Sequence, residues 1–139
     1  MSERYFNIFI THAWRFHRDW TELTKILNTI EGDTWTNFSV PWYDPAIRVH
    51  SEGGQKELER QLYSQILPAK LIIFLLGPYQ TNSARYWFDL QIQISIELKK
   101  RVVLLQPLQN ELRIEKHPDI EAPCIDWKIE SLRAAALGH

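Results

Sequence analysis

Two side chains that could act on a ligand, Trp87 and Gln91, stand four residues apart in the segment that follows the apolar run Leu71–Leu76. We expect a helix from about Ala84 to Lys99, and on a helix a separation of four residues places both side chains on one face. An indole can stack on a flat ring, while a glutamine amide donates and accepts hydrogen bonds but carries no charge. The mouth between a strand and the next helix is where α/β sheets bind ligands. The pattern therefore predicts a binding site around these two side chains.

Short apolar segments and amphipathic segments alternate along the rest of the chain. This alternation predicts a parallel sheet with helices on both faces. The expected fold is a flavodoxin-like three-layer α/β/α arrangement around a five-stranded parallel sheet, built as a single domain over residues 1–139. The expected strands span 5–10, 34–40, 71–76, 102–105 and 124–127, and the expected helices span about 18–30, 55–67, 84–99 and 129–137.

Three connecting segments should meet at the carboxyl edge of such a sheet, where ligands bind. They are Thr11 to Trp14, Pro41 to Gly54, and Gly77 to Trp87. The second is long, and connections of this length in a small domain are often functional. We interpret it as a lid over the site.

The bulk composition excludes several classes of function. The 139 residues carry a formal net charge of −1, which gives no electrostatic basis for nucleic acid or an anionic membrane as the main partner. No apolar run is long enough to cross a bilayer. The N-terminal residues lack the features of a signal peptide. The single cysteine excludes an internal disulfide, so we expect a cytoplasmic protein.

Common cofactor and metal motifs are absent from the sequence. No glycine-rich phosphate loop is present, and the five histidines are scattered without a pattern that would complete a metal site. Cys124 is expected to be a small core residue rather than a nucleophile. The basic run Lys99–Arg101 is expected to offset the dipole of the helix that ends there.

Several motifs together resemble the Toll/interleukin-1 receptor (TIR) domain, and more narrowly the TIR-like proteins of bacterial Thoeris anti-phage systems. The resemblance runs in register over nearly the whole chain. The matching segments are Phe9-Ile10-Thr11-His12-Ala13-Trp14, Asn37-Phe38-Ser39-Val40-Pro41, Asp44-Pro45, the strand Leu71–Leu76 and the helix start Trp87–Gln91.

The resemblance implies that NAD⁺ is the substrate and that no further cofactor is needed. TIR enzymes cleave the bond between nicotinamide and ribose, and they form ADP-ribose, a cyclised isomer, or a conjugate with a small acceptor molecule. In Thoeris systems this product activates a separate effector. A homo-oligomer is a further expectation from the resemblance.

The resemblance also implies roles for individual residues. Gln91 stands where the family has its catalytic glutamate. The other implied substrate-binding positions are Thr11, His12, Ala13, Trp14, Pro41, Asp44, Ser83 and Trp87. Two of them have structural alternatives, because Ser83 could be the N-cap of its helix and Trp87 could be a core or lid aromatic.

The glutamine at position 91 has three interpretations. It is a deliberate replacement that traps substrate, the mark of a natural pseudoenzyme that binds without turnover, or a sign that another carboxylate acts. Of the carboxylates considered, Asp89 and Glu97 lie off the helical face of Gln91, and nothing in the sequence fixes Asp44 or Glu52 near it.

Two other classes of function remain open. One is a non-catalytic assembly module, which an aromatic-rich surface would suit. The other is a nucleoside or nucleotide glycosyl-transferring enzyme of similar fold, which would also use a carboxylate at a strand end.

Overall fold

Strand β3 (Leu71–Leu75) lies in the middle of the sheet, and all five of its residues are buried. An apolar run without polar alternation is typical of a strand that is covered on both faces. The computed structural model describes residues 6–11, 18–29, 35–37, 52–109 and 113–136.

The sheet is parallel throughout, with strand order β2-β1-β3-β4-β5. Strand β3 therefore pairs on one side with β1, where Leu71 lies opposite Ile8, and on the other side with β4, where Leu71 lies opposite Arg101. The predicted α/β class with a parallel sheet is confirmed. The remaining strands are β1 (Phe6–Ile10), β2 (Trp35–Asn37), β4 (Arg101–Leu105) and β5 (Cys124–Ile125).

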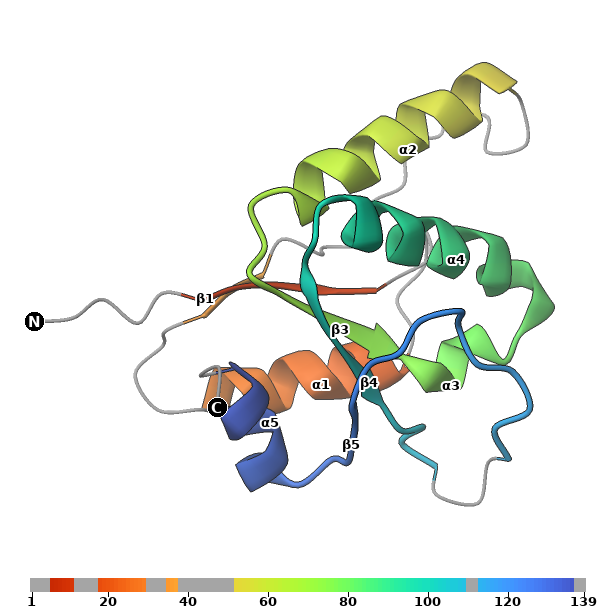
Figure 1. Ribbon diagram of the computed structural model, residues 1–139. Helices are drawn as coiled ribbons and strands as arrows, with labels where there is room; N and C mark the ends of the chain where they lie inside the picture. The colour runs from red at the N-terminus through yellow and green to blue at the C-terminus, as the bar shows by residue number, and fades with distance from the viewer. Residues whose placement is uncertain (1–5, 12–17, 30–34, 38–51, 110–112, 137–139) are drawn as a thin grey trace, which may run out of the picture.

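Helices cover both faces of this sheet (Figure 1). Helices α2 and α4 lie on one face and contact each other, while α1 and α5 lie on the opposite face. The short helix α3 follows β3 directly. The bounds are α1 (Arg18–Thr29), α2 (Glu52–Ile66), α3 (Leu76–Tyr79), α4 (Asn82–Glu97) and α5 (Ile129–Ala136).

The long helices α1 and α2 each bury one stripe of apolar side chains that recur at helical spacing. In α1 the stripe comprises Trp20, Leu23 and Leu27, and each is at most 8% exposed. In α2 the corresponding stripe is Leu58, Leu62 and Ile66. Packing of such stripes against a sheet supplies most of the stability of helices of this length.

Two segments expected to be loop are helical. Helix α2 begins at Glu52, so Gly53 and Gly54 belong to its first turn instead of to the preceding connection. Gly77-Pro78 lies within α3 and does not simply break the strand before it. Proline is tolerated there because the N–H groups of a first helical turn have no partner within the helix.

Two further expectations were wrong. Helix α4 begins at Asn82 with Thr81 at the N-cap position, so Ser83 lies inside the helix and is not its cap. Cys124 is exposed and not a core residue, because it begins a two-residue strand at the edge of the sheet. Its Sγ accepts a hydrogen bond from Gln106 Nε2 at 2.9 Å.

Two residues of the basic run Lys99–Arg101 bind carbonyl groups at the ends of α2 and α5, whereas the sequence predicts an interaction with the end of α4. Lys100 Nζ donates to the carbonyl of Leu67, just beyond α2, at 2.7 Å. Arg101 Nη1 donates to the carbonyl of Ala135 in α5, also at 2.7 Å. These cations satisfy carbonyl groups at helix ends, where they also complement the helix dipole. The turn that brings them there includes Lys99 with φ of 55°, in the left-handed region.

The pairing of β1 with β3 is extended by one side chain, Thr11. Its backbone N–H donates to the carbonyl of Ile73 at 3.0 Å, and its hydroxyl accepts from the backbone N–H of Leu75 at 2.9 Å. Thr11 is completely buried. The hydroxyl takes the position of a backbone carbonyl in an uninterrupted parallel ladder, so β3 remains paired where β1 ends.

Among the described helices, none combines the length and the apolar content that crossing a bilayer requires.

Replacing Thr11 with Val should lower the free energy of unfolding by about 1–3 kcal/mol, because the buried N–H of Leu75 loses its acceptor. Thr11→Ser keeps the hydroxyl and is the matched control. Urea denaturation of the three proteins measures the difference. If the Val and Ser variants lose equal stability, the hydroxyl does not contribute through this bond.

Candidate functional site

Trp87 and Gln91 lie one turn apart on the buried face of α4, as the spacing predicts. Trp87 is 7% exposed and Gln91 is 0% exposed. Gln91 Nε2 donates to the carbonyl of Trp87 at 2.8 Å, and the hydroxyl of Ser95 donates to the carbonyl of Gln91 at 2.7 Å. The side chain at position 91 is thus a buried, hydrogen-bonded neutral amide. A polar group in the interior needs such bonds, because burial removes its bonds to water.

The first half of α4 is held against α3 by a cluster around Tyr79. The Tyr79 hydroxyl donates to Asp89 Oδ1 at 2.6 Å, and the Tyr79 ring packs edge-on against Phe74 with 5.1 Å between ring centroids. The Arg85 guanidinium lies 5.8 Å from the centre of the Tyr79 ring, within cation–π range. These contacts fix the helix start that carries Trp87.

Asp89, one of the carboxylates considered as a replacement for the family glutamate, belongs to the same cluster. Asp89 is engaged with the Tyr79 hydroxyl, on another side of α4 from the buried amide. Burial, followed by the hydrogen bond to Asp89, raises the pKa of Tyr79 to about 12. Glu97 is exposed at the far end of the helix, and Glu52 begins α2.

Of the other predicted substrate-binding residues, the structure describes only Thr11 and Ser83. Thr11 lies at the end of β1, where its hydroxyl bonds to β3. Ser83 is the second residue of α4. His12, Ala13, Trp14, Pro41 and Asp44 lie outside the described residues.

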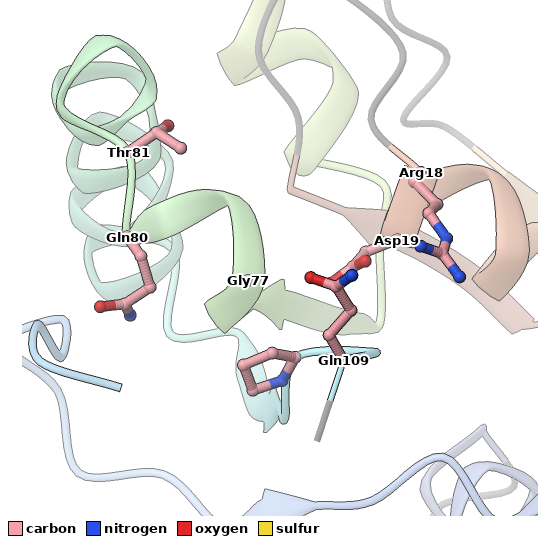
Figure 2. Close-up of a pocket in the computed structure, with 7 residues that line it drawn as sticks. Arg18, Asp19, Gly77, Gln80, Thr81 and Gln109 are labelled. Carbon is pink, nitrogen blue, oxygen red and sulfur yellow. The ribbon is translucent and has the colours of Figure 1, made fainter. Parts of the chain in front are cut away.

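A pocket that sequence reasoning missed lies at the carboxyl edge of β3 and β4 (Figure 2). Its volume is about 420 Å³. The start of α1, helix α3 and the segment that leaves β4 enclose it, and neither Trp87 nor Gln91 lines it. The lining residues are Arg18, Asp19, Gly77, Gln80, Thr81, Pro107 and Gln109.

Asp19 is a buried carboxylate in this pocket. It is 6% exposed, and its Oδ2 accepts a hydrogen bond from the backbone N–H of Leu108 at 3.2 Å. A β-carbon at position 77 would overlap Oδ2, so the carboxylate occupies space that only glycine leaves open. In the sequence, Asp19 is an acidic residue near the start of a helix, and Gly77 is a glycine just after an apolar strand. Only the fold shows that they meet.

Gln80 anchors the wall of the pocket to the segment between β4 and β5. Its Nε2 donates to the carbonyls of Leu76 and Lys116, at 3.1 and 2.8 Å. Its Oε1 accepts from the backbone N–H groups of Glu115 and Lys116, both at 3.0 Å. The Gln80 amide is therefore fully used in holding this segment beside α3.

Within the described part of the chain, no group of three or more His, Cys, Asp or Glu side chains could hold a metal ion.

Comparison with protein families identifies a family for this chain. The family described as Thoeris protein ThsB, TIR-like domain, matches residues 9–111. A search of curated proteins finds no match for the chain.

Gly77→Ala should lower the free energy of unfolding by about 1–3 kcal/mol, because the new β-carbon displaces the Asp19 carboxylate from its bond to Leu108. Gly53→Ala is the matched control, since a β-carbon there meets nothing within 4 Å and lies in a helix. This control should gain about 0.5–1 kcal/mol. Equal effects in thermal melts would contradict the close approach of Asp19 to Gly77.

The Tyr79 hydroxyl should make stability fall at alkaline pH. Its pKa in the folded chain, about 12, lies above the ordinary value of 10.0, so folding favours the protonated form. The contribution is fully present below pH 10 and is lost as pH rises through 12, to a total of about 3 kcal/mol. Tyr79→Phe should show a shallower decline over this range in urea titrations. Parallel declines for both proteins would show that Tyr79 is not the group responsible.

Proposed function

Because the chain belongs to the TIR-like domain family of Thoeris ThsB proteins, a family with a role in defence, we propose that it acts on NAD⁺. The proposed reaction breaks the bond between nicotinamide and ribose. The ADP-ribose moiety is released, cyclised or joined to a small acceptor, and the product activates a separate effector.

The observation that carries this proposal is the span of the family match. Residues 9–111 contain every position that the resemblance assigns to the substrate, from Thr11 through Trp87 and Gln91. The family match therefore spans all the segments that would form the site.

The residue type at position 91 would allow substrate binding while slowing the reaction. Cleavage of an N-glycosidic bond passes through an oxocarbenium-like state, which a nearby carboxylate stabilises. Gln91 offers the shape and the acceptor oxygen of a glutamate without its charge. If that charge supplies a few kcal/mol in the transition state, turnover falls by about 10²–10³. The proposal is therefore an NAD⁺-processing site in an inactivated or substrate-trapping form.

Burial adds a second reason for a neutral side chain at this position. A carboxylate at a fully buried position is desolvated, which raises its pKa and costs stability when it is charged. Gln91 avoids that cost while keeping its bond to the Trp87 carbonyl. A glutamate at position 91 would be favoured in its charged, reactive form by the cationic substrate. Without substrate, the buried charge would lower the stability of the folded protein.

A second candidate function is the non-catalytic assembly module. Large apolar side chains are exposed on and next to α2 and on α4, the two helices that cover one face of the sheet. They are Tyr63 in α2, Leu67 just beyond its end, and Tyr86 and Ile96 in α4, each at least 40% exposed. Exposed aromatic side chains are enriched in protein interfaces. Sedimentation over a range of concentrations tests this function, and a strict monomer that binds NAD⁺ argues against it.

Gln91→Glu should raise the rate of nicotinamide release from NAD⁺ about 10²–10³-fold over the parent chain, because it supplies the missing charge. Chromatography of the reaction products measures this rate, with and without an extract of phage-infected cells. Gln91→Ala is the control that removes the hydrogen bonds and adds no charge. A folded Glu variant that is as silent as the parent under both conditions would rule out the proposed chemistry.

A further inference from the structure

The pocket beside Asp19 has the position and size of a ligand site, although the proposed NAD⁺ site does not include it. It lies outside the carboxyl ends of β3 and β4, on the side of the sheet that α1 covers (Figures 1 and 2). Crevices at this edge of an open α/β sheet are the usual places for ligands. A volume of about 420 Å³ suits a small metabolite.

The pocket offers a hydrogen-bond acceptor that is held in place. Figure 2 shows the Asp19 side chain extending from α1 towards Gly77, across the pocket. The Leu108 N–H binds its Oδ2, and the missing β-carbon at Gly77 leaves room for it. A carboxylate positioned at this edge of a sheet is well suited to accept hydrogen bonds from sugar hydroxyls.

The pocket also offers donors at its rim. Arg18 and Gln109 are both exposed, and within the described ranges neither side chain makes a hydrogen bond or an ion pair. A guanidinium binds phosphate oxygens in a bidentate manner, and an amide can donate to the same group. The amide of Gln80 is already occupied, and the Thr81 hydroxyl already donates to the carbonyl of Pro78.

These groups select for a ligand that joins hydroxyl groups to an anion. A simple anion would meet the Arg18 guanidinium but would also face the carboxylate of Asp19. A neutral sugar could add hydrogen bonds to the carboxylate but would make no contact with the guanidinium that uses its charge. A phosphorylated sugar can contact both groups.

We propose that this pocket binds a phosphorylated pentose, free or as part of a nucleotide. The Asp19 carboxylate accepts from the sugar hydroxyls, the Arg18 guanidinium binds the phosphate, and the Gln109 amide donates to it. The proposal does not depend on cleavage of NAD⁺, because Trp87 and Gln91 do not line the pocket.

Titration of ¹⁵N-labelled protein with ribose 5-phosphate tests the proposal. We expect the amide signals of Gly77, Thr81, Leu108 and Gln109 to shift. Asp19→Asn, which keeps an acceptor for Leu108, and Arg18→Gln should each weaken binding about tenfold or more. Lys25→Gln is the matched control, because Lys25 lies on the same helix, pairs with Glu22 and does not line the pocket. Gln91→Glu should bind as the parent does.

Probes with one recognition group each separate the alternatives. Inorganic phosphate and ribose should both bind at least tenfold more weakly than ribose 5-phosphate, and adenosine monophosphate distinguishes a nucleotide from a free sugar phosphate. Equal binding of phosphoethanolamine would overturn the sugar assignment in favour of an ammonium group on Asp19. Absence of shifts at these amides at millimolar ligand, or binding that neither variant weakens, would overturn the site itself.

Discussion

The parallel pairing of β1 with β3 is the constraint on which the rest of the structure depends. In a parallel sheet every strand ends at the same edge, so segments far apart in the chain meet there. Thr11 extends this pairing by one step because its buried hydroxyl receives the N–H of Leu75. Helix α3 begins at Leu76, directly after that bond, and its second residue, Gly77, lies close to Asp19. The geometry of the whole carboxyl edge therefore follows from how these two strands end.

Two buried polar side chains near this framework show different solutions to one problem. Gln91 is neutral and satisfies its amide within its own helix. Asp19 is a carboxylate that receives a backbone N–H from a residue 89 positions away and relies on a glycine for space. A neutral amide at position 91 can remain buried, but it lacks the charge that the proposed catalysis requires. The second solution keeps an acceptor group in a pocket but requires a glycine at position 77. Both follow from the cost of burying polar groups.

The sequence predicts those features that depend on local periodicity. The apolar run of β3 and the stripes of α1 and α2 are visible as patterns, and so is the shared face of Trp87 and Gln91. The helical start at Glu52 was missed, because glycine pairs ordinarily end or interrupt helices. The pocket was missed for a different reason. Its carboxylate, its glycine and its backbone donor come from three separate segments, and no local pattern records that they converge.

The exposed thiol of Cys124 gives the molecule a single natural attachment point for a spectroscopic reporter. No other cysteine competes for an alkylating dye, so the chain needs no engineering before labelling. Partial burial raises the pKa of this thiol, so efficient labelling calls for mildly alkaline solution, in which the reactive thiolate is more abundant. The hydrogen bond from Gln106 places the sulfur beside the residue that precedes Pro107. A fluorophore there would sense rearrangements of β5 and of the neighbouring loop in real time.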